Sequence, residues 1–223
     1  RASAALVAAA GLVLTGLAAA GSGESPWDSA GGNEQNTRFQ ANETKIAGEV
    51  KGFDVTQYLS GKEARRYDTF IHYGLVATME AVQDAGLIDY AGDKERIGVC
   101  IGSGIGGLPM IEETARAFAE GGVRKISPFF VPGSIINMIA GLVSIHYGFK
   151  GPNLATVSAC STANHSIGEA ARLIEYGDAD IMVAGGSEST VSPLGIGGFC
   201  ASRALSTRND DPVAASRPWD TGR

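Results

Sequence analysis

From Lys45 onward, short apolar runs recur along the chain at a length that suits buried strands. The runs are rich in β-branched residues, and glycine, proline and asparagine lie between them, where they end strands and form turns. These runs predict buried strands at residues 97–101, 154–157 and 181–184, and a further short strand at residues 46–50.

Three longer stretches instead carry apolar residues at helical spacing, and a glycine follows each of them. They predict helices at residues 67–85, 135–147 and 161–176, with a helical turn at residues 55–59. The second helix, for which Ser134 is the expected N-cap, is apolar on most faces, which indicates burial between layers. Strands and helices therefore alternate, and this alternation predicts an α/β fold.

The composition is that of a globular protein, since 44% of the 223 residues are hydrophobic and 19% are charged. The formal net charge of -6 leaves no basic excess to neutralise phosphates, which argues against nucleic acid as a partner. Cys100, Cys160 and Cys200 form no CxxC pair. This spacing favours a reducing compartment, the cytoplasm, and argues against a structural zinc site or a disulfide framework.

Cys160 stands where the predicted strand at residues 154–157 gives way to the helix at residues 161–176. At a helix entrance, unpaired N–H groups and the positive end of the helix dipole favour a thiolate, so this position suits a nucleophile. From this pattern alone, a buried, inert cysteine at a tight turn stays open as the alternative.

A cysteine hydrolase is poorly supported, because it needs a histidine within hydrogen-bond reach of the thiol. His165 follows Cys160 by five residues, which places it about 140° away around the helix. His72 and His146 lie on the other two predicted helices.

The stretch after the strand at residues 97–101 contains G-x-G-x-x-G through Gly102, Gly104 and Gly107. In a dinucleotide-binding fold such a turn opens a helix, and an acidic residue follows about 20 positions later. That neighbourhood here is GVRK, at residues 122–125, so a nucleotide site is only a weakly supported alternative.

Several motifs together resemble the elongating β-ketoacyl-acyl carrier protein synthases of the synthase II type. They are GSGIGG at residues 102–107, KISPFFVP at 125–132, VSACSTA at 157–163, YGDAD at 176–180, AGGSE at 184–188 and ALSTRN at 204–209. They occur in order across residues 45–220, so the resemblance covers most of the chain. It implies a thiolase-like layered αβαβα fold, of which this chain would supply the N-terminal half.

By this resemblance, Cys160 is the catalytic nucleophile of a β-ketoacyl-acyl carrier protein (ACP) synthase. It would take an acyl group from acyl-ACP, and the acyl-enzyme would condense with malonyl-ACP in fatty acid chain elongation. The glycine-rich turn would let backbone approach the cysteine closely. Ile105 would lie at the floor of the acyl pocket, and Phe199 would gate it over the cysteine. Phe130, near the two-fold interface of a homodimer, would close the acyl tunnel of the partner.

The family also implies a docking surface for the acidic carrier protein, made of Lys62, Arg65, Arg66 and Arg203. From the residues alone, the cluster at 62–66 is equally readable as a solvated charged turn. No metal or organic cofactor is implied, since the carrier substrates bring their own pantetheine arm. The family's catalytic histidine and lysine motifs lie in a second half and do not occur here, so we expect the chain to be truncated and inactive alone.

The N-terminal 44 residues match the family least, so the domain is expected to span residues 45–223. Residues 1–20 have the layout of a secretory signal peptide. However, residues 12–17 resemble the family's first strand, which favours a cytoplasmic strand and no membrane segment. Residues 21–44 are rich in glycine, serine and asparagine, and are either divergent or the product of a reading-frame error.

Other functions stay open at this point. A polyketide ketosynthase would share the fold, and so would its non-catalytic chain-length partner, although such partners replace the nucleophile. A redox-regulated binding domain with a reactive thiol would show alkylation without acyl transfer.

Overall fold

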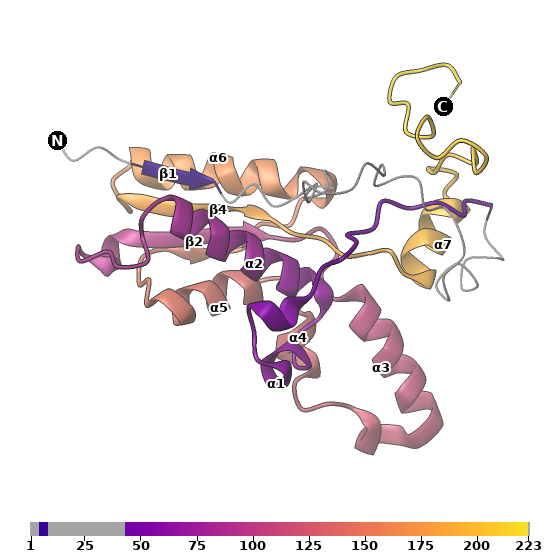
Figure 1. The fold of residues 1–223 in the computed structure, drawn as a ribbon, viewed down its shortest axis with the longest axis horizontal. Helices are drawn as coiled ribbons and strands as arrows, with labels where there is room; N and C mark the ends of the chain where they lie inside the picture. Colours follow the sequence, from indigo (N-terminus) through magenta and orange to yellow (C-terminus); the bar gives the residue numbers. More distant parts are fainter. Residues whose placement is uncertain (1–4, 9–42, 223) are drawn as a thin grey trace. The chain divides into compact units, whose positions relative to one another are not determined.

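A computed structural model describes residues 5–8 and 43–222 and divides the chain into two units (Figure 1). The first unit comprises Arg1–Val13 and Asp54–Ser189, and the second comprises Leu14–Phe53 and Thr190–Arg223. The strand predicted at residues 12–17 lies outside the described residues. The structure places its first strand, β1, at Ala5–Ala8.

The first unit is built on a parallel sheet with helices on both faces. The sheet has the order β1-β4-β2-β3, and its further strands are β2 (Ile97–Gly102), β3 (Asn153–Leu154) and β4 (Ile181–Gly186). The helices, with 3-10 turns labelled η, are η2 (Val55–Gln57), α1 (Gly61–Ala64), α2 (Thr69–Asp84), η3 (Lys94–Arg96), α3 (Leu108–Gly121), η4 (Gly122–Lys125), α4 (Phe130–Ser134), α5 (Met138–Tyr147), η5 (Ala159–Ser161) and α6 (Thr162–Glu175). Parallel strands need crossover connections, and these helices supply them.

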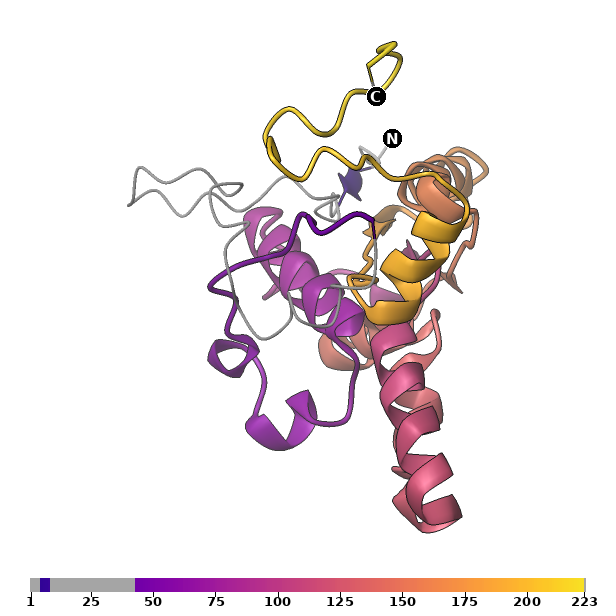
Figure 2. The same cartoon turned by 90° about the vertical axis from the view of Figure 1, so that its right-hand side faces the viewer.

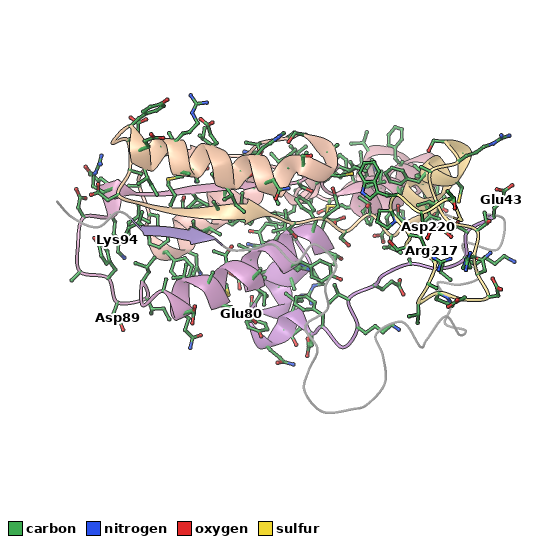
Figure 3. All side chains as sticks on the ribbon, turned by 90° about the horizontal axis from the view of Figure 1, so that it is seen from above. Glu43, Glu80, Asp89, Lys94, Arg217 and Asp220 are labelled. Carbon is green, nitrogen blue, oxygen red and sulfur yellow. The ribbon has the colours of Figure 1, made fainter. Side chains whose placement is uncertain are left out.

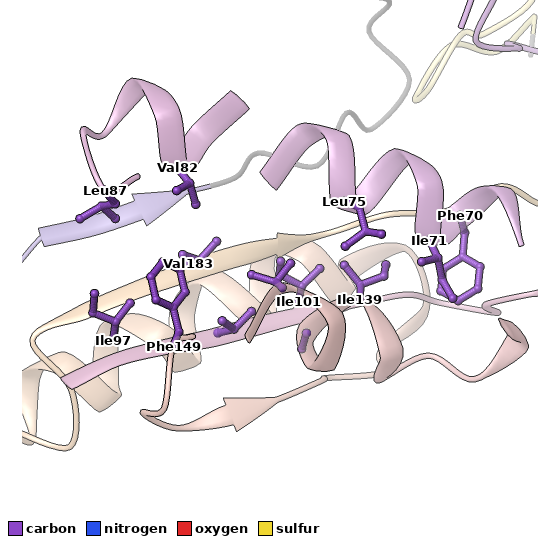
Figure 4. Close-up of a cluster of buried hydrophobic side chains, with 13 residues drawn as sticks. Phe70, Ile71, Leu75, Val82, Leu87, Ile97, Ile101, Ile139, Phe149 and Val183 are labelled. Atoms are coloured by element: carbon purple, nitrogen blue, oxygen red, sulfur yellow. The ribbon is translucent and has the colours of Figure 1, made fainter. Parts of the chain in front are cut away.

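The two faces of the sheet have separate cores, because alternate side chains of β2 and β4 point in opposite directions. Figure 1 shows α6 on one side of the sheet and α2 with α5 on the other. The core toward α2 and α5 (Figure 4) consists of Phe70, Ile71, Leu75, Val82, Leu87, Ile97, Val99, Ile101, Ile139, Ala140, Val143, Phe149 and Val183. The core toward α6 consists of Cys100, Ala170, Ala179, Met182 and Ala184.

Asp68 joins the starts of two helices. Its Oδ1 accepts the N–H of Phe70 in the first turn of α2 (3.2 Å), and its Oδ2 accepts the N–H of Met110 in the first turn of α3 (2.8 Å). From this junction α3 runs away from the sheet (Figures 1 and 2). Glu80 is exposed on α2 (Figure 3).

Most of the predicted elements are confirmed. The helices at residues 67–85 and 161–176, the turn at 55–59 and the strands at 97–101 and 181–184 correspond to α2, α6, η2, β2 and β4. The two helices were predicted by their apolar period, and the two strands by short continuous apolar runs between turn residues.

Two predicted strands are wrong. Residues 46–50 form no strand; the preceding backbone N–H, that of Lys45, donates to Asn209 Oδ1 (2.7 Å) instead of joining a ladder. The buried strand at 154–157 is reduced to the two residues of β3, which are exposed. β3 is the last strand in the sheet order and pairs only with Val99 and Cys100.

The predictions for the second helix also need correction. Ser134 ends α4 and does not cap α5; its hydroxyl donates to the carbonyl of Phe130 (2.8 Å). α5 is not buried on most faces, because Ile139 is fully buried whereas Ile145 is 77% exposed. The chain turns left-handed at Gly148 and ends α5 there, as glycine allows.

The second unit is held together by contacts between residues 43–53 and the C-terminal segment. Thr44 Oγ1 donates to the carbonyl of Ser206 (2.8 Å), and Asn209 Nδ2 donates to the carbonyl of Glu43 (2.8 Å). Its helix α7 (Pro193–Ala201) begins at Ser192, whose hydroxyl accepts the N–H of Gly195 (3.1 Å).

Replacing Ile139 with alanine should lower the free energy of unfolding by about 2–5 kcal/mol, because a cavity opens in the α2–α5 core. Ile145→Ala, on the same helix, is the matched control and should change it by less than about 0.5 kcal/mol. Urea unfolding of the 223-residue chain measures both. Equal losses would show that α5 is buried on both faces.

Candidate active site

Cys160 lies in a sharp turn between the sheet and α6. The turn is η5, and the residue before the cysteine, Ala159, has φ 53°, in the left-handed region that non-glycine residues rarely adopt. α6 begins only at Thr162. Cys160 is an exposed residue, whereas Cys100 is buried and Cys200 is half-buried. Cys160 is therefore not the buried cysteine of the alternative interpretation, and its reactivity stays a prediction.

Hydroxyl groups fix the turn on both sides of Cys160. Thr162 Oγ1 accepts the N–H of Ser158 (2.9 Å), and Thr156 Oγ1 donates to the carbonyl of Thr162 (3.2 Å). Thr156 Oγ1 also shares a 2.7 Å hydrogen bond with the hydroxyl of Ser166, which is fully buried in α6. Buried hydroxyls that are all paired hold a local geometry firmly, so the strained backbone at Ala159 is supported.

The glycine-rich turn lies directly against this segment. A Cβ on Gly102 would stand 2.1 Å from the carbonyl oxygen of Thr156 and 2.7 Å from Thr162 Cγ2. A Cβ on Gly104 would stand 3.3 Å from the carbonyl oxygen of Ala159. Only glycine permits such an approach, so the expected close contact between this turn and the nucleophile segment is confirmed.

The same turn also abuts the end of α4. The N–H of Gly107 donates to the carbonyl of Ser134 (3.0 Å), and a Cβ on Gly107 would stand 2.6 Å from Ser134 Cα. α4 begins at the half-buried Phe130. Ile105, at the centre of the turn, is 40% exposed. The structure therefore links the segments of Cys160, Ile105 and Phe130 through one glycine-rich turn.

Glu188 is a member of this site that the sequence reasoning missed. It follows β4, and its carboxylate accepts the hydroxyl of Ser103 (3.2 Å) and the backbone N–H of Ile105 (2.9 Å). The available signal was its place just after a buried strand, at the edge where parallel strands present functional groups.

The three histidines have partners other than Cys160. His165 shares a 2.6 Å hydrogen bond with Ser158 Oγ through Nδ1, and His72 shares one of 2.9 Å with the carbonyl of Ala64 through Nε2. His146 lies edge-on to the ring of Tyr147. Burial lowers the pKa of His72, which keeps its ring neutral. The pair of His165 and Ser158 was also missed, because it depends on the shape of the turn.

The predicted docking residues Lys62, Arg65 and Arg66 lie on and just after α1. This helix begins with a capping box in which Ser60 and Glu63 bind each other's backbone, a signature that the sequence reasoning passed over. Lys62 and Arg65 are exposed, while Arg66 is half-buried with its guanidinium 4.5 Å from the ring centroid of Phe129. The solvated-turn alternative therefore does not describe Arg66.

The remaining predicted residues, Phe199 and Arg203, belong to the second unit. Phe199 lies on α7 and is 42% exposed. Arg203 follows α7 with a left-handed φ of 55°, and its N–H donates to the carbonyl of Cys200 (2.9 Å). Their roles stay predictions.

Burial changes the pKa of one cysteine and one carboxylate of the first unit. Burial raises the pKa of the Cys100 thiol, which keeps it protonated and unreactive. Burial also raises the pKa of Asp68, against the lowering effect of the N–H groups of Met110 and Phe70.

The side chains that the structure describes contain no group of three or more potential ligands that could hold a metal ion. Within the same residues, no helix has the length and apolar character needed to span a membrane.

Comparison with known proteins places this geometry among its relatives. The family described as "Beta-ketoacyl synthase, N-terminal domain" matches residues 14–223. A 3-oxoacyl-[acyl-carrier-protein] synthase 2 of Vibrio cholerae is 58% identical over 180 residues, which are 81% of this chain and 44% of that protein. Its counterpart in Coxiella burnetii is 53% identical over 189 residues, which are 84% of this chain and 46% of that protein.

Solved structures agree with these relatives. A β-ketoacyl synthase from Burkholderia phymatum matches with a TM-score of 0.74 and 28% identity, over 84% of this chain and 46% of that one. A type II polyketide synthase ketosynthase, solved in complex with its acyl-carrier protein, matches with a TM-score of 0.65 and 26% identity, over 77% of this chain and 49% of that one. The chain spans about half the length of the relatives that it matches.

Cys160 should be the cysteine that iodoacetamide modifies first, because its sulfur is exposed at a helix entrance. Cys100 should react last, since it is buried and its pKa is raised. Mass mapping after a brief treatment measures the order, with the denatured chain as the reference. Faster labelling of Cys100 or Cys200 would contradict the assignment of the nucleophile.

Proposed function

Because the chain belongs to the β-ketoacyl synthase family, we propose that it forms the nucleophile-bearing part of a 3-oxoacyl-ACP synthase that elongates fatty acids. Its predicted thiolase-like fold is confirmed by the solved ketosynthases that it matches. The observation that carries the proposal is the exposed Cys160, held in a strained turn at the start of α6 and backed by glycines.

In the first step, the thiolate of Cys160 attacks the carbonyl carbon of the acyl-ACP thioester. The carbon–sulfur bond to the carrier's pantetheine breaks, and the pantetheine sulfur leaves as a thiolate. The oxyanion formed during the attack is stabilised in part by the backbone N–H of Cys160. The first hydrogen bond of η5 runs from the N–H of Ser161 to the carbonyl of Ser158 (3.2 Å), so the N–H of Cys160 lies before it, at the start of the turn.

In the second step, malonyl-ACP loses carbon dioxide, and the resulting carbanion attacks the acyl group on Cys160. The new carbon–carbon bond lengthens the chain by two carbons, and Cys160 leaves as a thiolate. The negative charge on the malonyl thioester oxygen needs positioned donors in a site that excludes water. His165 is engaged by Ser158, and His72 by Ala64. We assign these donors to the part of the relatives that this chain does not match.

The acyl pocket is proposed to involve Ile105, Phe130 and Phe199, and docking of the acidic carrier to involve Lys62, Arg65, Arg66 and Arg203. A homodimer in the cytoplasm, with acyl-ACP and malonyl-ACP as partners, completes the proposal. The polyketide-type ketosynthase is less well supported, because its identity to the chain is 26%, against 58% for the 3-oxoacyl-[acyl-carrier-protein] synthase 2 of Vibrio cholerae. A chain-length partner is disfavoured because Cys160 is present.

Reversing the charge of Arg65 should raise the KM for acyl-ACP by about tenfold, because the exposed guanidinium would attract the acidic carrier. Small acyl-thioester analogues should react unchanged, and the effect should shrink as salt rises. Lys150→Glu, an exposed lysine outside the docking residues, is the matched control. Steady-state kinetics measure KM for acyl-ACP and for the small analogues in each variant. An equal rise in KM for both substrates would mean that Arg65 has a structural role.

Residues 1–223 alone should not release carbon dioxide from malonyl-ACP, because His72 and His165 are hydrogen-bonded to other residues and His146 lies on α5, against the ring of Tyr147. The same residues joined to the C-terminal part of the Vibrio cholerae relative should release it. A radiochemical assay of both proteins compares them directly. Decarboxylation by residues 1–223 alone would place the donors within this chain and contradict the assignment.

A further inference from the structure

The carboxylate of Glu188 reaches from the end of β4 to the turn that follows the neighbouring strand β2. Its Oε1 accepts the hydroxyl of Ser103 (3.2 Å), and its Oε2 accepts the backbone N–H of Ile105 (2.9 Å). The hydroxyl oxygen of Ser103, which donates to Glu188, also accepts the N–H of Gly106 (3.1 Å). The side chain of Glu188 therefore holds the turn at two successive points, directly and through a serine.

This turn has little stiffness of its own. Four of its six residues, 102, 104, 106 and 107, are glycines, and glycine loses more conformational freedom on ordering than any other residue. The backbone helps at the strand end, where the N–H of Ser187 donates to the carbonyl of Gly102 (3.0 Å). Beyond that point, Glu188 supplies the acceptor for the N–H of Ile105.

The clamp lies close to the nucleophile turn. A Cβ on Gly104 would stand 2.8 Å from Glu188 Oε2 and 3.3 Å from the carbonyl oxygen of Ala159. The carboxylate and the residue before Cys160 are thus separated by a single glycine. Ile105, which Glu188 holds, follows Gly104 directly, so the clamped residue is next to the one that meets the turn of Cys160.

We propose that Glu188 is a positioning residue that holds Ile105 against the acyl chain on Cys160 and so favours long acyl chains. This inference rests on the proposed function, because it needs Ile105 to form part of an acyl pocket. Without the hydrogen bonds of Glu188, the turn would lose conformational entropy each time an acyl chain packs against it. Only an acyl chain long enough to reach Ile105 would incur this cost, so short chains would be unaffected.

The test compares Glu188→Ala with Glu188→Gln in the complete gene product that contains these 223 residues. Intact mass spectrometry follows acylation of Cys160 by hexadecanoyl-ACP and by butanoyl-ACP. Glu188→Ala removes both hydrogen bonds to the turn and should lower the ratio of the two rates by about fivefold, while the butanoyl rate stays nearly unchanged. Glu188→Gln should keep the ratio, because its amide oxygen can accept the N–H of Ile105 and its amide nitrogen can donate to Ser103.

Two further variants control for folding and for charge. Glu120→Ala removes an exposed carboxylate from α3 and should behave like the wild type. Slow alkylation of Cys100, which is buried, reports that a variant is folded. If Cys100 becomes reactive in Glu188→Ala, Glu188→Asp replaces it in the test. Aspartate keeps the charge but has a shorter side chain, so this variant should lower the ratio of the two rates similarly.

An unchanged ratio in Glu188→Ala, or equal losses with both substrates, would overturn the inference. A loss in Glu188→Gln as large as in Glu188→Ala would also overturn it, because charge and not hydrogen-bond geometry would then be at work. If the wild-type protein formed no acyl-Cys160 with either substrate, the proposed function would fail, and this inference with it.

Discussion

The site depends on how closely the backbone of the glycine-rich turn approaches its neighbours. At Gly102 an added Cβ would meet the carbonyl oxygen of Thr156 at 2.1 Å, and at Gly107 it would meet Ser134 Cα at 2.6 Å. Both obstacles are backbone atoms, which cannot rotate away as the end of a flexible side chain can. The segments of Thr156 and Ser134 can therefore both pack against the glycine-rich turn only because glycines stand at the points of contact.

The parallel sheet places this turn where chemistry can use it. β2 and β4 run side by side in register, so the glycine-rich turn and Glu188 leave the sheet at the same edge. On that edge the chain enters α6 through the left-handed Ala159, a conformation that costs about 1–2 kcal/mol for a residue with a Cβ. The paired hydroxyls of Thr156, Thr162 and Ser166 offset this strain and keep the thiol of Cys160 outside the core.

The sequence predicted α2 and α6 from their helical apolar period, and β2 and β4 from short continuous apolar runs, which the structure buries in the sheet. It failed at residues 154–157, because an apolar pattern predicts that a segment is buried but does not identify the residues that cover it. Within this chain, Leu154 is 42% exposed and Val157 is 59% exposed. Cys160 was correctly placed just before a helix because the apolar period of α6 starts directly after it, although the strand expected before it is reduced to β3; its role as the nucleophile stays a prediction. Glu188 was not predicted, because a lone acidic residue after a strand has no spacing rule, and its partners are 83 and 85 positions away.

The stacking of Arg66 on Phe129 gives α4 a second neighbour besides the glycine-rich turn. The main chain there is equally close, since a Cβ on Gly133 would stand 2.4 Å from the carbonyl oxygen of Arg66, and the N–H of Asp68 donates to the carbonyl of Gly133 (3.0 Å). One short helix thus contacts both the segment of Arg66, through Gly133, and the glycine-rich turn, through Ser134. Because Gly133 and Ser134 are adjacent, a displacement of the chain at Arg66 would act on α4 one residue away from its contact with the turn.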